Sequence, residues 1–427
     1  MLMRLVTVGA ALTAVVAAIP TQRRSAWPFA PFKTSGRDIV DTNGDKVLYA
    51  GTNWPGHNDV MIPEGLQYQS IESIVSMIKS LGMNVVRLTY AIEMVDDIFS
   101  NKNSTLSAAL DNALGSVNGS IVLQQILSHN PSFTASTTRL EVYDAVTAEC
   151  YKQQLLVHLD NHVSKGEWCC STGDGNAWFG SEFFNVENWR RGNAFMANHA
   201  KSWPAYVSQG LRNELRDPNN TALNYGWESW YQNVIPTADA VNAANPDPLI
   251  FYSGLHFDTD LANVTAGIPL TPDGSVFDIS DFCYADKIVF ELHNYNNALA
   301  DANCANFNLT KSGYNAMDIS STSTAKNFAP VVLTEFGFPQ TPTNYTLPYA
   351  QCIKEYLTTA LPGGPGGWIH WAVGGSYYIR EGVQDNDETW GLLNHDWSAW
   401  RSPAAVENYF LPFVQATLGE ESYGYSS

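Results

Sequence analysis

The chain is poor in positive charge. Of its 427 residues only 23 are Lys or Arg, against 42 Asp or Glu, which gives a formal net charge of −19. So acidic a protein is a poor partner for nucleic acid, for anionic membranes and for polyanionic sugars such as pectin, and it suits a neutral ligand. No long apolar run follows residues 5–19, so we expect no membrane-spanning helix.

Several motifs are also absent. There is no GxSxG nucleophile elbow and no HExxH zinc motif, which argues against the hydrolase chemistries that use them. No CxxC pair occurs, which disfavours a metal cluster. We find no internal repeat, no Pro/Ser linker and no appended binding module. A single domain over residues 25–427 is therefore expected.

The N-terminus has the features of a secretory leader. Arg4 precedes the apolar residues 5–19, small residues Ala17 and Ala18 lie near a cleavage point, and the dibasic pair 23–24 offers a second processing site. We expect residues 1–24 to be signal peptide and short propeptide. The mature chain would then begin near Ser25 with 20 basic and 42 acidic residues, a net charge of −22.

The cysteine count fits a secreted protein. Six cysteines suggest disulfides, although six allow fifteen pairings. Cys283 and Cys304 flank one predicted strand and are the best single pair. A bond between the adjacent Cys169 and Cys170 would be strained, so different partners are expected for each; the remaining two are Cys150 and Cys352. Glycosylation sequons, which favour a eukaryotic secretory route, begin at Asn103, Asn118, Asn219, Asn263, Asn308 and Asn344.

Eight short apolar runs predict strands that are buried on both faces, as in a parallel sheet. Most alternate with helical patterns, and together they predict an α/β fold, a (β/α)8 TIM barrel. An open doubly wound sheet is the alternative, but residues 51–56 do not form its glycine-rich phosphate turn. Residues 93–137 are expected to be an irregular excursion or lid. The strands are expected at 47–54, 84–90, 155–162, 207–214, 249–254, 287–293, 331–335 and 367–372, and helices at 70–82, 139–153, 188–203, 225–244, 349–361 and 403–417.

Two of these strands end in a glutamate, at Glu214 and Glu335. A barrel holds its chemistry at the carboxyl ends of its strands, and two carboxylates facing each other there suit retaining glycoside hydrolysis. One carboxyl would protonate the leaving oxygen and the other would attack the sugar carbon. Other candidate residues at or near strand ends are Arg87, His162, Asn213, His293, Tyr295 and Trp371.

These residues, in this order and on these strands, resemble glycoside hydrolase family 5, the cellulase-type barrels, over almost the whole mature chain. The Asn213–Glu214 pair and the Thr-Glu-Phe-Gly that contains Glu335 are the most specific parts. Leu215 departs from the proline often found there in relatives, a position without a chemical role. His158 lies near His162 on the same predicted strand and is the alternative to it.

The resemblance implies that Glu335 is the nucleophile and Glu214 the acid/base, with no metal or organic cofactor. Arg87 is suited to keep Glu335 ionised, and Tyr295 to donate a hydrogen bond to it. Asn213 is suited to bind a sugar 2-hydroxyl. We expect His162 and His293 to position the sugar and the acid, and Trp371, with Trp54, to offer flat faces for a pyranose.

The expected substrate is a neutral β-linked oligo- or polysaccharide, first a β-1,4-glucan cleaved internally. An exo-acting β-glucosidase, a mannanase, a glycolipid glycosidase or a transglycosylase would use the same residues, and a non-catalytic carbohydrate-binding barrel is the alternative from another class. A lid at 93–137 would favour exo action. Tyr377, Tyr378 and Trp390 either wall the cleft or pack. We expect a secreted monomer of fungal origin, without nucleic acid or membrane partners.

Overall fold

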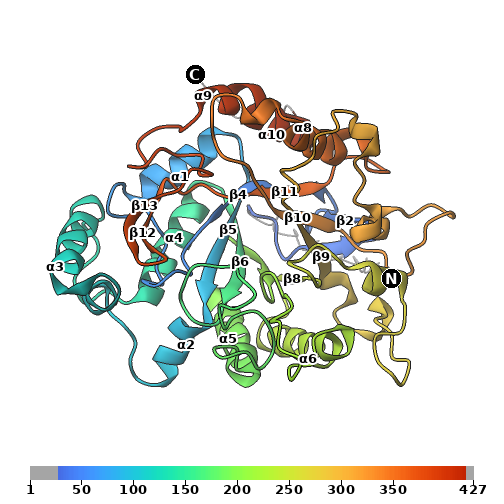
Figure 1. Ribbon diagram of the computed structural model, residues 1–427, viewed down its shortest axis with the longest axis horizontal. Helices are drawn as coiled ribbons and strands as arrows, with labels where there is room; N and C mark the ends of the chain where they lie inside the picture. The colour runs from blue at the N-terminus through green and yellow to red at the C-terminus, as the bar shows by residue number, and fades with distance from the viewer. Residues whose placement is uncertain (1–26, 420–427) are drawn as a thin grey trace, which may run out of the picture.

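A closed barrel of eight parallel strands forms the centre of the computed structural model, which describes residues 27–419 (Figure 1). The predicted (β/α)8 barrel is confirmed. The predicted leader and the start of the mature chain lie outside the described residues. In barrel order the strands are β10 (Val331–Phe336), β11 (Gly367–His370), β4 (Ala50–Trp54), β5 (Val85–Ala91), β6 (Leu156–Val163), β7 (Tyr206–Gly210), β8 (Leu249–Tyr252) and β9 (Ile288–Asn294).

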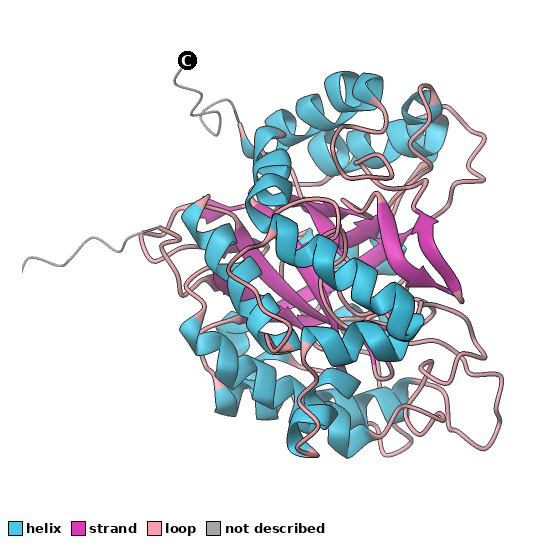
Figure 2. Cartoon of the chain, turned by 90° about the vertical axis from the view of Figure 1, so that its left-hand side faces the viewer, coloured by secondary structure: helices cyan, strands magenta, loops and turns pink. Residues whose placement is uncertain are grey.

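Helices surround this barrel, so the strands are covered on their outer face as well as packed inside (Figure 2). Capping residues in the sequence fix where two helices start: the Ser70 hydroxyl accepts the Ser73 N–H, and Thr138 and Glu141 form a capping box. The main helices are α1 (Ile71–Ser80), α4 (Arg139–Lys152), α5 (Val186–His199), α6 (Trp227–Ala244), α8 (Pro348–Glu355) and α10 (Leu411–Leu418); α7 (Ala262–Ala266) and α9 (Pro403–Ala405) are short.

The excursion after β5 is helical, so the prediction of an irregular lid over 93–137 is wrong. It contains α2 (Ile92–Phe99) and α3 (Leu106–His129), and Gly115, with φ of 77°, interrupts α3. That interruption splits the apolar pattern into two short pieces, which hid the helix in the sequence. Helix α3 lies at one side of the barrel beside the hairpin of β12 (Ser376–Arg380) and β13 (Val383–Asp387) (Figure 1).

A small antiparallel sheet precedes the barrel. It consists of β1 (Lys33–Ser35), β2 (Asp38–Val40) and β3 (Lys46–Val47), so the single strand expected at 47–54 is divided between this sheet and β4. Phe32, Ile39 and Tyr49 pack with apolar side chains at the start of the barrel strands, which closes the amino-terminal end of the barrel. Among residues 27–419 no helix combines the length and apolar character needed to cross a bilayer.

The disulfides differ from those expected. Cys304 pairs with Cys352, because α8 packs against the short turn that carries Cys304, whereas Cys283 is exposed and unpaired. The adjacent Cys169 and Cys170 are bonded to each other in the loop after β6. Both the predicted Cys283–Cys304 bond and the expectation of separate partners for Cys169 and Cys170 are therefore wrong.

Candidate active site

A cavity of about 520 Å³ opens where the barrel strands end at their carboxyl termini. Six of the predicted catalytic and substrate-binding residues line it, and they come from five different strands or the segments that follow them. This convergence is the arrangement expected for a barrel enzyme. The lining residues are His162, Trp168, Cys169, Cys170, Asn213, Glu214, Phe257, Thr259, Tyr295, Glu335, Trp371, Arg380, Glu388, Thr389 and Trp390.

The two glutamates face each other across this cavity. One carboxyl oxygen of Glu214, one of Glu335 and a ring nitrogen of His293 all lie within 4.8 Å of one another. Carboxyl groups about 5–5.5 Å apart are typical of retaining glycosidases, whereas inverting enzymes leave about 6.5–9.5 Å for a water molecule. The glutamate pair therefore has the close spacing of a retaining pair.

The backbone places each glutamate differently from a simple strand end. Strand β7 stops at Gly210, so Glu214 lies in the segment after it, with φ of 47° and its N–H donating to Asp258 Oδ2 at 2.8 Å. Glu335 lies inside β10, where the register with β9 shifts between Leu333 and Glu335. A register shift in a strand re-aims the side chains beside it, and here it occurs next to Glu335.

Glu335 is held by a cation and a phenol. Arg87 Nη1 lies 2.5 Å from Oε1, and the Tyr295 hydroxyl donates to Oε2 at 2.8 Å. Burial raises the pKa of Glu335 and the nearby Glu214 adds to that shift, whereas Arg87 and the Tyr295 hydrogen bond oppose it. These contacts stabilise the ionised carboxylate, the form that a nucleophile requires.

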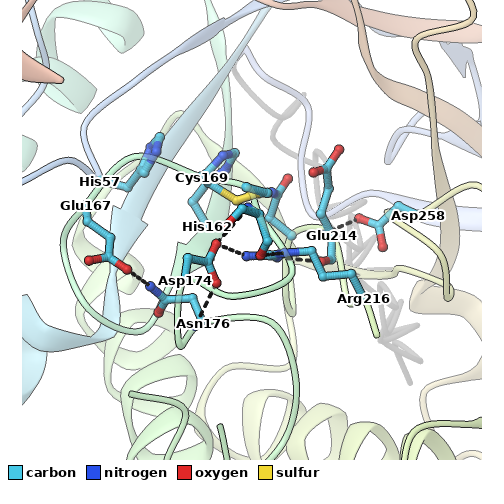
Figure 3. Close-up of a disulfide and its surroundings, with 12 residues drawn as sticks. His57, His162, Glu167, Cys169, Asp174, Asn176, Glu214, Arg216 and Asp258 are labelled. Atoms are coloured by element: carbon cyan, nitrogen blue, oxygen red, sulfur yellow. Dashed lines mark hydrogen bonds and ion pairs between the residues drawn. A yellow bond between two sulfur atoms is a disulfide. The ribbon is translucent and has the colours of Figure 1, made fainter. Parts of the chain in front are cut away.

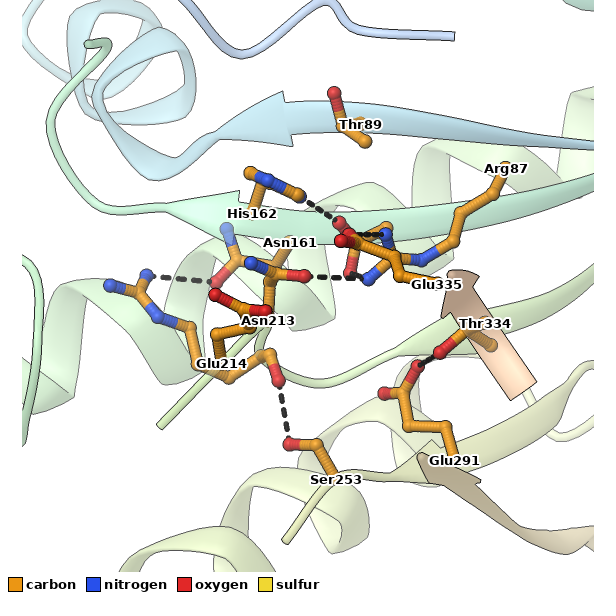
Figure 4. A network of polar contacts seen from close by, with 12 residues as sticks. Arg87, Thr89, Asn161, His162, Asn213, Glu214, Ser253, Glu291, Thr334 and Glu335 are labelled. Carbon is orange, nitrogen blue, oxygen red and sulfur yellow. Dashed lines mark hydrogen bonds and ion pairs between the residues drawn. The ribbon is translucent and has the colours of Figure 1, made fainter. Parts of the chain in front are cut away.

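Arg87 also organises the floor of the cavity (Figure 4). Its fully buried guanidinium donates to Asn53 Oδ1 at 2.8 Å and to Asn213 Oδ1 at 2.9 Å, and it forms an ion pair with Asp160 at 2.9 Å. Because the carbonyl oxygen of Asn213 faces Arg87, its amide nitrogen points the other way. On that side the Asn213 amide donates to the sulfur atoms of Cys169 and Cys170 at 3.6 and 3.5 Å.

Burial favours the protonated form of Glu214. Burial raises its pKa to about 7, although Arg216 and Arg87 act in the opposite direction. His293 Nδ1 lies 3.1 Å from Glu214 Oε1, and burial lowers the pKa of His293 to about 4, which leaves this imidazole neutral near pH 7. Glu214 therefore retains a proton in mildly acidic solution, as a general acid must.

A chain of hydrogen bonds continues from His293 into the barrel. His293 Nε2 lies 3.1 Å from the Thr334 hydroxyl, which donates to Glu291 Oε2 at 2.9 Å (Figure 4). Glu291 is fully buried, and burial raises its pKa to about 8. The ring orientation of His293 is thus fixed from behind by a carboxyl group that does not line the cavity.

His162 and Trp371 form one wall. Asp160 Oδ2 lies 2.7 Å from His162 Nδ1, and the His162 ring stacks on Trp371 with centroids 5.2 Å apart. His158 instead contacts the buried Ser208 hydroxyl, so of the two histidines it is His162 that lines the cavity. Arg87 and His293 lie just beneath the lining residues rather than among them.

Trp54 is not part of this wall. It is fully buried, its indole N–H donates to the Glu64 carbonyl at 3.0 Å, and its ring packs on Trp397. The expectation that Trp54 offers a face to a sugar is therefore wrong. Tyr377 and Tyr378 also pack in the interior, whereas Trp390 lines the cavity.

Several lining residues were not found from the sequence. Trp168 and the disulfide come from the loop after β6, and Arg380 and Glu388 from the β12–β13 hairpin and the turn that follows it. Arg380 lies over the Trp168 ring at 3.6 Å and pairs with Glu388. No local sequence pattern marks these positions, because the contact of Arg380 with Trp168 joins segments more than 200 residues apart.

Two groups in the described residues bring His, Cys, Asp or Glu atoms close enough to hold a metal ion. One is Glu214, His293 and Glu335, where the Arg87 guanidinium already neutralises the Glu335 carboxylate. The other combines His162 with Cys169 and Cys170, whose sulfur atoms are bonded to each other. Neither donor set is that of a dedicated metal site, since a neighbouring cation and a disulfide both weaken binding of a metal.

The sequence matches the family description "Cellulase (glycosyl hydrolase family 5)" over residues 40–374. The chain belongs to glycoside hydrolase family 5. A family 5 relative, the "Glycosyl hydrolase 5 family protein" of Chamaecyparis obtusa, is 35% identical over 385 residues, 87% of this chain. The chain spans 64% of the length of that relative.

Two further proteins are similar to the chain at lower identity. An endoglucanase of Paenibacillus polymyxa is 21% identical over 382 residues, covering 87% of this chain and 84% of that protein. The catalytic domain of the major endoglucanase of Xanthomonas campestris pv. campestris superposes with a TM-score of 0.63 at 18% identity, over 90% of this chain and all of that domain. The structural likeness bears on the fold, which is the family's barrel.

Proposed function

We propose that this family 5 protein is a retaining glycoside hydrolase that cleaves β-1,4-linked glucans by double displacement. The observation that carries the proposal is the facing pair of Glu214 and Glu335. Their carboxyl oxygens lie within 4.8 Å of each other, and their surroundings favour different protonation states. One carboxyl is held by Arg87 and Tyr295 as an anion, and the other is buried beside a neutral imidazole.

In the first step Glu335 attacks the anomeric carbon while Glu214 gives its proton to the departing glycosidic oxygen. The bond from the anomeric carbon to that oxygen breaks, and a glycosyl ester of Glu335 forms. Asn213 is placed to donate to the sugar 2-hydroxyl, an interaction that strengthens as positive charge develops on the ring.

In the second step Glu214, now ionised, removes a proton from water, and the water oxygen attacks the anomeric carbon. The ester bond to Glu335 breaks and the carboxylate returns to Arg87 and Tyr295. Two inversions restore the original β configuration. His293 stays neutral throughout and orients Glu214 for both proton transfers.

The lining residues support a neutral glucan as substrate. Trp371, Trp168 and Trp390 offer aromatic faces on which a pyranose can stack, and the charges of Arg380 and Glu388 are paired with each other. None of the lining residues of this cavity comes from 93–137, so the excursion gives no support to exo action. The names of the endoglucanase relatives also favour internal cleavage of a β-glucan.

We further propose that the protein acts as a secreted monomer. The apolar leader, the dibasic site and the sequons support secretion. The fungal source stays a prediction. Product analysis also distinguishes the alternative activities, which are exo-glucosidase, mannanase, glycolipid glycosidase and transglycosylase. A non-catalytic carbohydrate-binding barrel would be expected to lack one of the two glutamates.

The test is product analysis by the purified protein on a panel of β-linked polysaccharides, oligosaccharides and aryl glycosides, with Glu335→Gln as blank. We expect a spread of oligosaccharides from β-1,4-glucan, with the β anomer formed first in NMR spectra of the products. Formation of the α anomer first would overturn the retaining mechanism. Release of single sugars only, or of glycosyl transfer products, would replace the endo-hydrolase assignment.

A further inference from the structure

The Cys169–Cys170 disulfide has no part in the double displacement, yet it lies in the cavity. Both cysteines are lining residues, Cys169 buried and Cys170 half-buried, in the loop after β6 (Figure 3). Cys304 and Cys352, in contrast, do not line the cavity. A bond between neighbouring residues closes almost no loop, so it contributes little through chain entropy. A role in binding accounts better for its place.

The disulfide lies against the side chain that we assign to the sugar 2-hydroxyl. Asn213 Nδ2 lies 3.6 Å from the Cys169 sulfur and 3.5 Å from the Cys170 sulfur, while Asn213 Oδ1 accepts from Arg87. Sulfur is a weak acceptor, so these contacts orient the amide and are readily displaced by a sugar hydroxyl, which is a stronger acceptor. A sugar hydroxyl that binds Asn213 must therefore come close to both sulfur atoms.

Arg216 ties the disulfide loop to the segment of the general acid. Its buried guanidinium donates to the Ser171 carbonyl at 2.8 Å and to the Glu214 carbonyl at 2.7 Å, and it pairs with Asp174 (Figure 3). The disulfide and Glu214 therefore share one anchor. This bracing holds the disulfide loop in place relative to the Glu214 segment.

We propose that the Cys169–Cys170 disulfide is a specificity-determining wall of the sugar site, on the side of the 2-hydroxyl. Its polarisable, apolar sulfur atoms contact the pyranose beside C2, hold the 2-hydroxyl against Asn213, and exclude bulky 2-substituents such as an acetamido group. The inference rests on the proposed function, because it assumes that Glu214 and Glu335 define where the sugar ring lies.

The test compares the double variant Cys169→Ala/Cys170→Ala with the matched control Cys304→Ala/Cys352→Ala. The substrates are an aryl β-glucoside or aryl cellobioside and its analogue lacking the 2-hydroxyl on the sugar at the cleavage point. For the parent substrate we expect the first variant to raise KM about tenfold with kcat within about threefold, and the control to leave both unchanged. For the 2-deoxy analogue the loss should be much smaller, because the two changes remove the same interaction.

A second readout separates a contact from a loosened loop. The 2-acetamido analogue should gain in kcat/KM relative to the parent substrate in the Cys169→Ala/Cys170→Ala variant, whereas a merely structural defect would lower both together. An unchanged KM, or equal losses on the parent and 2-deoxy substrates, in a protein with unaltered circular dichroism would overturn the inference.

Two arrangements keep the test decisive. If the double variant does not fold, the Cys304→Ala/Cys352→Ala protein is assayed with and without a phosphine reductant, which then acts on the Cys169–Cys170 bond. We expect the reductant to raise KM as the double variant would. An unchanged KM would overturn the inference that the disulfide contacts the sugar. If the parent protein hydrolyses no glycoside, the proposed function fails. In that case the disulfide is tested by binding of cello-oligosaccharides to the Glu335→Gln protein. Weaker binding after removal of the Cys169–Cys170 bond would support a contact between the disulfide and the sugar, and equal binding would overturn it.

Discussion

Arg87 and Glu335 form an ion pair inside the barrel, with Nη1 of Arg87 2.5 Å from Oε1 of the carboxylate. The pair joins β5 to β10, two strands that are not neighbours in the barrel. A charge pair removed from water is stable only when its remaining hydrogen bonds are also made. Asn53, Asn213 and Asp160 provide partners for the same guanidinium.

We therefore expect Arg87→Lys to lower kcat about 100-fold and to lower the melting temperature. A lysine carries the charge, but it cannot reach Glu335, Asn213 and Asp160 at the same time in the planar arrangement that a guanidinium allows. Steady-state kinetics on an aryl glucoside and thermal unfolding would measure both effects. A kcat within threefold of the parent would show that this ion pair does not support the nucleophile.

Glu214→Ala should affect substrates according to their leaving groups. Poor leaving groups need the proton of Glu214, so their turnover should fall about 1,000-fold or more, whereas activated aryl glycosides should form the glycosyl ester with a much smaller loss. Azide should restore the rate with aryl substrates by replacing water in the second step. Equal losses on both classes of substrate would contradict the acid/base role.

The pH profile should follow the raised pKa of Glu214. Because the protonated form is active in the first step, kcat/KM should fall as the pH rises through about 7.

The raised pKa of Glu214 also affects stability. Between the unfolded pKa of about 4.3 and the folded pKa of about 7, the carboxyl is protonated in the folded protein and ionised in the unfolded chain. The free energy of unfolding therefore falls as the pH rises through that window. Glu214→Gln should thus raise the melting temperature more at pH 8 than at pH 4. A uniform change at both pH values would count against the shifted pKa.

Glu291 acts through His293 rather than on the substrate. Glu291→Leu removes the acceptor for the Thr334 hydroxyl and should lower kcat about tenfold with little change in KM, because the imidazole that orients Glu214 loses its support. Glu291→Gln keeps an acceptor at the same place and should retain most of kcat. If both variants lost activity equally, the hydrogen bond that Glu291 accepts from Thr334 would not be what supports His293.

Two tryptophans that looked alike in the sequence should behave differently. Trp371→Ala removes a lining face beside His162 and should raise KM for oligosaccharides about tenfold. Trp54→Phe loses the hydrogen bond to the Glu64 carbonyl and should lower the melting temperature while KM stays unchanged. A change in KM for Trp54→Phe would indicate that the cavity wall rests on Trp54.

The barrel was predictable because most of its strands lie in short apolar runs that alternate with helical patterns and end near polar residues. The alternation of side chains along a strand would also have predicted two buried partners of the site. Asp160 and Glu291 precede His162 and His293 by two positions, so each points to the same side of its strand as the histidine. The register shifts at β6 and β10 have no sequence signal, because they depend on the neighbouring strands.

The loops were much less predictable. Disulfide pairing depends on which loops meet in space, and this is why Cys304 joins Cys352 rather than Cys283. Helix α3 escaped notice since Gly115 breaks its periodicity, and Trp54 was misplaced because a strand-end tryptophan can point either into the cavity or into the core. In each case long-range packing decided the outcome.

Helix α3 has a mechanical consequence for the mouth of the cavity. Gln384 of the β12–β13 hairpin donates to the Leu114 carbonyl and accepts from Asn118, so the hairpin is buttressed from outside by the helix. The same hairpin carries Arg380, which covers Trp168 at the rim. A polymer pressing on that rim would push the hairpin against α3 on both sides of its interruption at Gly115. Helix α3 does not line the cavity, yet its stiffness at this break would determine how far the opening can widen.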